Sequence, residues 1–364
     1  MSKNHGTREI VRVDIGGKPS RSATLADGTV SIVGLLEGTW TSEAQGWNLI
    51  ALPTSNNKTF RLLMNQYGET LSFNRFADLD VPNRGVTPDS SNDTDQKIDA
   101  IAYEQIVHQR EVEDFPPSKL TAKNGDGIHH EPGFFLQLRN HVIAGHTEEV
   151  KKGVLEKGDD VELTIARQAS IPHGNSVLAM GTIRTFDGPP KIVGDNPEIG
   201  EMGNEDATPE RIKEKEFKKN TYLAPYDHFE ENHFLGNVGD SKATGFPGLF
   251  PTDANAILKF ALSTFGKRVK KTTVLHFDTK YRNEQLTSTP ISNIPFVVRE
   301  ANVTEMHADF WIMELEKHDE SEPAEFIMQY SQTVYLEFFD SDDEKEKGKL
   351  IRWPHVSINT LRKV

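Results

Sequence analysis

The feature that most constrains the fold is a long series of short β-type runs separated by turn residues. The runs are rich in branched and aromatic side chains, and Gly, Pro, Asn and Asp stand between them. They predict a mainly β protein, a closed antiparallel up-and-down β-barrel of about 10–12 strands. The predicted strands are residues 39–52, 59–63, 69–77, 98–110, 133–138, 161–169, 176–185, 272–278, 296–303, 306–315, 326–339 and 351–361.

Two parts of the chain do not follow this pattern. Residues 1–34 are polar and rich in glycine, which predicts an N-terminal arm ahead of one barrel domain, residues 35–364. Between residues 187 and 270 the β pattern stops, so we expect a loop and helix insertion there. It contains a charged helix that begins at Thr208-Pro209 and an amphipathic helix over residues 252–266.

Composition excludes several classes of function. The chain has no cysteine, so disulfides, thiolate metal sites, iron–sulfur clusters and covalently attached heme are all excluded. The net charge is −14, and no cluster of Lys and Arg is interleaved with aromatic residues, so nucleic acid is not an expected partner. No apolar run approaches the ~20 residues of a membrane span, and no secretory signal begins the chain. We therefore expect a cytoplasmic protein with no membrane partner.

The last predicted strand carries a single histidine, His355. In an extended strand alternate side chains share a face, so Trp353, His355 and Ser357 point one way while Val356 and Ile358 point the other. If His355 faces a cavity, its neutral imidazole is a candidate ligand for iron or zinc. The structural alternative is a hydrogen-bonded histidine of the core or rim.

Two further histidines are candidates for chemistry. His129 precedes a predicted strand and shares a face with Glu131, whereas the adjacent His130 points to the opposite face. His173 lies in the turn Pro172-His-Gly174. The alternative for either residue is an ordinary polar residue at a barrel rim. The sequence has no nucleophile elbow, Walker loop, dinucleotide fingerprint or His-Glu-x-x-His helix, which argues against the common hydrolases, kinases, dehydrogenases and zinc proteases.

Three stretches together resemble the nitrobindins. They are Gly38-Thr39-Trp40, the run from His129 through Glu131-Pro-Gly133 to Phe134, and His355 followed by Leu361-Arg362. The resemblance implies a lipocalin-like or fatty-acid-binding-protein-like barrel that holds heme b, with His355 as the proximal iron ligand. It also implies a ferric, solvent-accessible heme and peroxynitrite isomerisation. The cofactor-binding residues expected with His355 are Trp40, Phe134 and Trp353.

Two function hypotheses follow. In the first, a heme b-binding barrel handles a small oxidant, as a peroxynitrite isomerase or a peroxidase, and His173 or His129 is the distal group that polarises the oxidant or transfers a proton. In the second, the barrel carries a lipid-like hydrophobic ligand without metal, and the helix over residues 252–266 is a lid. Residues 187–270 have no counterpart in the nitrobindins, and these longer loops are compatible with a distinct substrate.

The alternation also raises a question about the outer wall. If His355 faces the lumen, Val356 and Ile358 lie outside, and the strand 326–339 has one strongly apolar face. An exposed apolar patch of this kind needs a cover, and we predict a two-fold homodimer built across the C-terminal strands.

Overall fold

A computed structural model describes most of the chain. The described residues are 30–53, 60–75, 82–83, 96–118, 122–138, 143–144, 162–193, 224–238, 245–279, 290–319, 321, 323–340 and 350–364. The predicted helix beginning at Thr208-Pro209 and most of the predicted N-terminal arm lie outside these residues.

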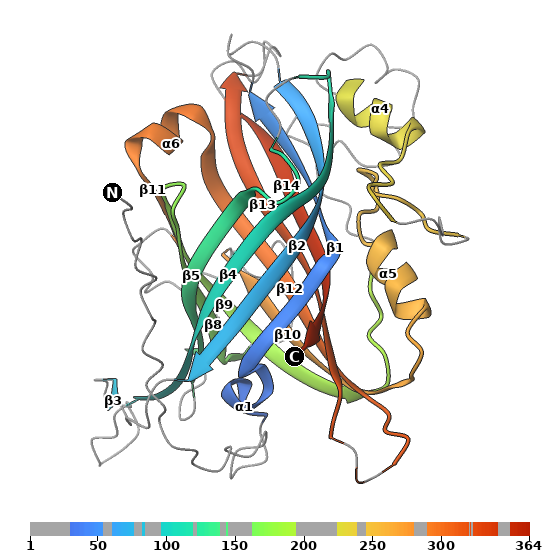
Figure 1. Ribbon diagram of the computed structural model, residues 1–364. Helices are drawn as coiled ribbons and strands as arrows, with labels where there is room; N and C mark the ends of the chain where they lie inside the picture. The colour runs from blue at the N-terminus through green and yellow to red at the C-terminus, as the bar shows by residue number, and fades with distance from the viewer. Residues whose placement is uncertain are drawn as a thin grey trace, which may run out of the picture.

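Ten strands form a closed antiparallel barrel, which confirms the predicted fold class (Figure 1). The ring closes because the last strand pairs with the first and because β9 also pairs with β10. Its strands in spatial order are β1 (Gly38–Pro53), β2 (Phe60–Arg75), β4 (Gln96–Phe115), β5 (Gly127–Leu138), β8 (Ile165–Ile171), β9 (Asn175–Asp187), β10 (Val269–Asp278), β12 (Asn302–Leu315), β13 (Phe326–Asp340) and β14 (Leu350–Lys363). Four short strands supplement the ring: β3 (Pro82–Asn83), β6 (Ile143–Ala144), β7 (Glu162–Leu163) and β11 (Ile291–Asn293).

Two strand predictions were wrong in informative ways. The predicted strands 59–63 and 69–77 form one strand, β2, because Gly68 does not make a turn. A Cβ at Gly68 would lie 2.4 Å from the carbonyl oxygen of Glu43, so the glycine permits close approach of β1. The predicted strand 296–303 is mostly the helix α6 (Pro295–Glu300), because Pro295 occupies the first helical position and favours helix geometry.

The alternation of side chains divides each strand between two environments. On β13, Tyr330 and Val334 face the lumen, whereas Ile327 and Gln329 face outward. The apolar face of β13 is therefore the inner one. Below the cavity the lumen is filled by packed aromatic rings, among them Phe73, Phe135, Phe277 and Phe310.

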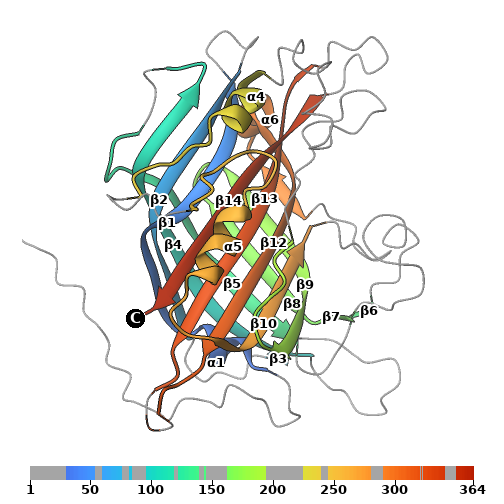
Figure 2. The same ribbon diagram turned by 90° about the vertical axis from the view of Figure 1, so that its right-hand side faces the viewer.

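The outer face of the C-terminal strands is covered by the chain itself. The described residues 224–238 and 245–263 include α4 (Ala224–Glu231) and α5 (Ala256–Ser263), which lie along the outside of β1, β14 and β13 (Figure 2). Trp47 packs against Phe234 and Phe246, and the amide nitrogen of Gln329 donates to the carbonyl of Leu258 at 3.0 Å. The amphipathic helix predicted at 252–266 is thus shorter and lies on the wall, not at the mouth.

This cover removes the reason given for a homodimer. Val356 and Ile358 are 1% and 0% exposed within the single chain, so the expected apolar patch on β14 is not open. The oligomeric state stays a prediction without that support.

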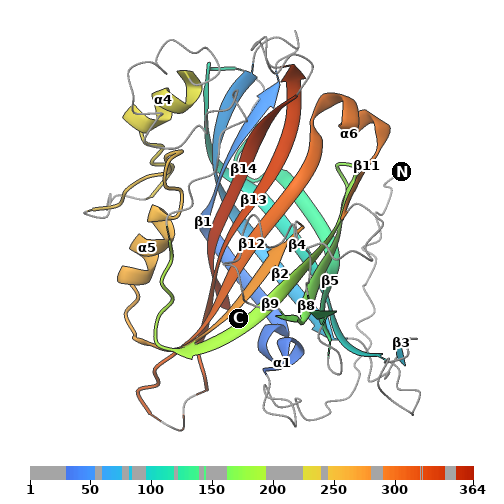
Figure 3. The same ribbon diagram turned by 180° about the vertical axis from the view of Figure 1, so that it is seen from behind.

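The two ends of the barrel differ. At one end α1 (Ile32–Leu36) closes the barrel, and the buried indole of Trp40 donates to the carbonyl of Leu36 at 2.8 Å. At the other end α6 and β11 border the opening (Figure 3). The last residues assigned to the arm, Ile32 and Val33, therefore belong to the core. No helix among the described residues is long and apolar enough to cross a membrane.

The outer cover should contribute to stability. Leu258 on α5 is fully buried against the barrel wall, and Leu258→Ala should lower the free energy of unfolding by roughly 2–5 kcal/mol through lost burial and a cavity. Urea denaturation measures this. The control Ser263→Ala, at the exposed end of the same helix, should stay within about 0.5 kcal/mol of the parent. Equal stabilities of Leu258→Ala and the parent would show that α5 does not cover the wall.

Candidate functional site

The barrel contains a cavity of about 540 Å³ in the half nearer α6. This volume lies within the ordinary range of small-molecule sites. Its walls are mainly apolar, and the mouth is bordered by α6. The apolar lining includes Ile50, Leu52, Leu63, Val107, Ile171, Val177, Phe296, Val303, Met306, Val334 and Leu336.

Three histidines line this cavity, and they are the three that the sequence analysis selected: His129, His173 and His355. Their strands are far apart in the sequence but are brought to one lumen by the closed ring. His130 is different, because it lies on the outer face with its ring nitrogen 2.8 Å from a carboxylate oxygen of Glu104. The alternation predicted for the adjacent histidines is therefore confirmed.

His355 presents a neutral imidazole to the cavity. Its Nε2 lies 3.4 Å from the hydroxyl of Ser357, and this weak contact is its one hydrogen bond within the described residues. Burial, followed by the nearby His129 and His173, lowers the pKa of His355 to about 3. A histidine of this kind keeps its nitrogen lone pair available near neutral pH.

His129 and His173 lie together on another part of the wall, with ring centroids 5.5 Å apart. Burial, and then the neighbouring His129, lower the pKa of His173. His173 has no hydrogen-bond partner among the residues that the structure describes. Its turn is fixed at Gly174, which has φ +113° and whose added Cβ would lie 2.5 Å from Ile294. The amide of Ile294, which precedes α6, donates to the carbonyl of Gly174 at 2.9 Å.

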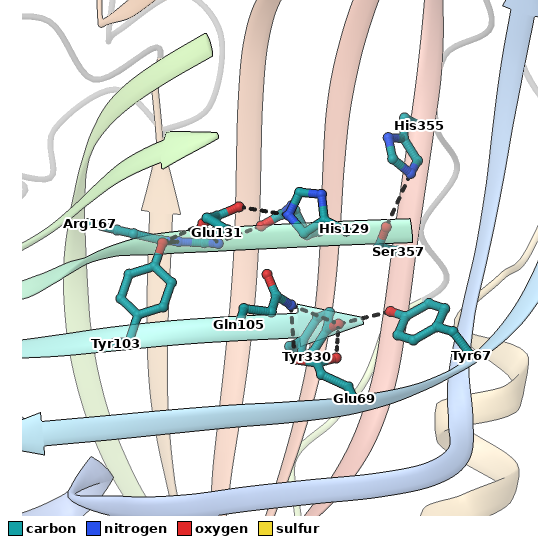
Figure 4. Close-up of polar contacts among 11 residues, drawn as sticks. Tyr67, Glu69, Tyr103, Gln105, His129, Glu131, Arg167, Tyr330, His355 and Ser357 are labelled. Atoms are coloured by element: carbon teal, nitrogen blue, oxygen red, sulfur yellow. Dashed lines mark hydrogen bonds and ion pairs between the residues drawn. The ribbon is translucent and has the colours of Figure 1, made fainter. Parts of the chain in front are cut away.

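His129 is supported by a buried ion pair. Its Nε2 lies 3.2 Å from Glu131 Oε2, while Glu131 Oε1 accepts from Arg167 Nη2 at 2.6 Å and from the hydroxyl of Tyr103 (Figure 4). Glu131 and Arg167 are 2% and 3% exposed. Arg167 also donates to Gln332 at 2.5 Å.

The electrostatics of this group favour an ionised carboxylate. Burial alone would raise the pKa of Glu131, but the charge of Arg167, followed by the hydrogen bond from His129, holds that pKa well below its usual range. The guanidinium of Arg167 is surrounded by aromatic rings, 5.5 Å from the ring centroids of Tyr103 and Phe310. The pair is therefore rigidly packed as well as charged.

A second polar cluster lies beneath the cavity floor around Glu69. Its carboxylate accepts from Tyr330 at 2.6 Å, from Asn359 at 2.7 Å and from Gln105 at 2.9 Å, and Tyr330 also contacts the hydroxyl of Tyr67 at 2.8 Å (Figure 4). Burial raises the pKa of Glu69, and the hydrogen bonds from these neutral partners offset this only in part. Glu69 is thus a buried acid held by neutral donors.

None of the three aromatic residues expected to bind the cofactor lines the cavity. Trp40 is packed at the closed end, where the Lys363 ammonium lies 5.1 Å from its ring. Trp353 stacks on Phe338, and its indole donates to the carbonyl of Phe338 at 3.0 Å. Phe134 is half-buried and does not line the cavity. By alternation it points away from the lumen, since Phe135 occupies the inner face.

Sequence reasoning missed the polar residues that support the histidines. Arg167 and Glu69 were available as signals, because a charged side chain inside a β-type run must be paired or solvated. Their partners could not be inferred, because Arg167 and Glu131 come from different strands. Glu131 was noted for sharing a face with His129, and the structure adds that the two are in contact.

The donor set does not suit a bare metal ion. Within the described ranges, no three or more His, Asp or Glu side chains are placed to hold a metal together. Glu131 is fully engaged by Arg167, Tyr103 and His129. A ligand that needs a single imidazole donor is compatible with His355.

Comparison with known proteins adds little. No family model matches the sequence, and no curated protein matches it. A solved structure described as "Crystal Structure of Rv2717c from M. tuberculosis" aligns with 90% of this chain and 92% of its own, at 9% identity and a TM-score of 0.31. A score this low carries no argument, so the fold assignment depends on the strand pairing alone.

Breaking the buried ion pair should be costly. Glu131→Gln leaves Arg167 buried without a counter-charge, so we expect a loss of about 3–5 kcal/mol in unfolding free energy. The double variant Glu131→Gln/Arg167→Met should recover most of this loss. The exposed pair offers the control Glu104→Gln, which should change stability by less than about 0.5 kcal/mol. If the single variant is as stable as the control, the pair is not desolvated as described.

The depressed pKa of His355 predicts a pH dependence. Between a folded pKa of about 3 and an unfolded pKa of about 6.5, the unfolded state binds more protons. The contribution of His355 to the free energy of unfolding is therefore fully present above about pH 6.5 and is lost as the pH falls toward 3. As the pH falls through this window, the unfolding free energy of the parent should decrease relative to that of His355→Leu. A constant difference from about pH 7 to pH 4 would show that His355 is as solvated in the folded chain as in the unfolded one.

Proposed function

We propose that this barrel binds heme b in its cavity and that His355 is the axial iron ligand. The observation that carries the proposal is an uncharged, weakly hydrogen-bonded imidazole on the wall of a mainly apolar cavity of about 540 Å³. The sequence resemblance to the nitrobindins gives independent support for the same histidine.

The residues present fit such a group. A non-covalent heme needs one protein donor to the iron and apolar walls around the ring, and it needs no cysteine. His355 supplies the donor, and residues such as Leu336 and Met306 supply apolar contact area. Ser357 can orient the imidazole through its weak contact with Nε2, leaving Nδ1 as the nitrogen free to bind.

The proposed activity is the handling of a small oxidant, as a peroxynitrite isomerase or a peroxidase does. A bound heme would supply a redox-active iron that accepts a small oxidant. The protein would contribute an apolar enclosure that limits water and imidazoles that bind or move a proton on the ligand.

An alternative is a metal-free carrier of a lipid-like hydrophobic molecule. It is favoured by the mouth, where Phe296 and Val297 of α6 line the cavity while Ile294, Phe296 and Val298 are about half exposed. An apolar opening of this kind suits the passage of an apolar ligand.

Hemin titration tests the proposal. The purified chain should take up one hemin with a shifted Soret band, and His355→Ala should weaken binding by at least about ten-fold, or about 1.4 kcal/mol. The matched control is His130→Ala on the outer face, which should bind hemin as the parent does. An unchanged spectrum and affinity in His355→Ala would reject the axial role. A parent chain that ignores hemin but binds a fluorescent fatty-acid probe one to one would favour the carrier.

A further inference from the structure

We propose that His129, and not His173, is the proton acceptor of the cavity, and that the site is built for a small protic molecule that gives up its proton on binding. Glu131 and Arg167 are positioning residues for His129. The inference extends the proposed function, since the bound anion would sit beside the group that His355 holds.

The first argument is the tautomer of His129. An ionised carboxylate can only accept hydrogen bonds, so the His129 nitrogen that faces Glu131, Nε2, is the one that carries hydrogen. The other nitrogen, Nδ1, makes no hydrogen bond within the described residues and retains its lone pair. Since His129 lines the cavity and its ring is 27% exposed, this lone pair is open to a ligand there.

The second argument is that the carboxylate cannot turn away. Its second oxygen is held by Arg167 at 2.6 Å and by Tyr103, and Arg167 is itself fixed by Tyr103 at 3.1 Å and Gln332 at 2.5 Å. Every polar group in this chain of contacts is satisfied. The carboxylate charge next to His129 is therefore permanent, and it stabilises an imidazolium when His129 takes a proton.

The third argument compares His129 with the other two cavity histidines. His173 has no carboxylate partner among the described residues, and the one hydrogen bond of His355 goes to a hydroxyl. Other titratable groups at the cavity are Tyr67, Tyr330 and Glu300, and Glu69 lies beneath Tyr330 and Gln105. Of the three cavity imidazoles, His129 alone is in contact with a buried carboxylate in the described part of the chain.

The proposed step moves one proton from the ligand to His129. A protic molecule H–X enters the cavity, its proton passes to Nδ1 of His129, and X⁻ remains as the bound anion. The charge pair formed, imidazolium and X⁻, is enclosed by apolar walls, and Glu131 offsets the new positive charge. Candidate ligands are weak small acids such as hydrogen peroxide, organic hydroperoxides and hydrogen cyanide.

Cyanide is the test probe, because it is protonated in neutral water and binds ferric heme as the anion. In the hemin-loaded full chain, His129→Gln should slow cyanide association at pH 7 by at least about a hundred-fold, the lower end of what a positioned base contributes. The matched variant His173→Gln should stay within about two-fold. Neutral imidazole binds iron through a nitrogen lone pair without giving up a proton, so its association, measured above about pH 8 where imidazole is uncharged, should be unchanged in both variants.

Three outcomes would overturn the assignment: no slowing in His129→Gln, equal slowing in both variants, or equal slowing of cyanide and imidazole. A chain that binds no hemin rejects the proposed function, and the tautomer is then judged on the ligand-free protein. There, ¹⁵N NMR should show a protected Nε2–H on His129 and an unprotonated Nδ1. The preference for this tautomer should weaken in Glu131→Gln/Arg167→Met, the double variant expected to fold, because an amide can present either an acceptor or a donor to His129. A protonated Nδ1 in the parent would overturn the inference without any reference to heme.

Discussion

The closed ring of strands is the constraint on which the rest of the structure depends. Pairing of β9 with β10 leaves the ring without a free edge, and every strand must satisfy an inner and an outer face at once. Inside, this produces packed aromatic rings at one end and a cavity at the other. Outside, the apolar side chains of β13 and β14, such as Ile327, Val356 and Ile358, are covered by α5 and its flanking residues. The insertion between β9 and β10 is therefore part of how the barrel is stabilised.

Within the lumen, similar side chains differ in protonation because their electrostatic surroundings differ. Glu131 is ionised because Arg167 is fixed against it, whereas burial among neutral donors raises the pKa of Glu69. His355 stays neutral because it is buried near two other imidazoles. One small volume thus contains a permanent ion pair, a buried acid and a neutral donor, and the surroundings decide the chemistry of each residue.

Local patterns in the sequence predicted the barrel, the shared face of His355 and Ser357 and the opposite faces of His129 and His130, because strand alternation is a local property. They left open whether the face of His355 is the inner one. They failed where distant segments decide the outcome. The cover over Val356 and Ile358 comes from residues about one hundred positions earlier, so it appeared from sequence as an exposed patch. The short helix at Pro295 was mistaken for a strand because its residues are branched and apolar. Phe134 and Trp353 were expected at the cavity. Phe134 lies on the outer face because the alternation places Phe135 inside, and Trp353 stacks on Phe338 instead.

The turn that carries His173 is joined to the helix at the mouth of the cavity. Gly174 touches Ile294 so closely that no side chain could be added there, and a backbone hydrogen bond joins the two. Because α6 follows Ile294 directly and borders the mouth, any displacement of the start of α6 would strain or break this contact. The position of the His173 turn is thereby coupled to that of α6. An isotope label on that imidazole would therefore report a movement of α6 even when no ligand is bound.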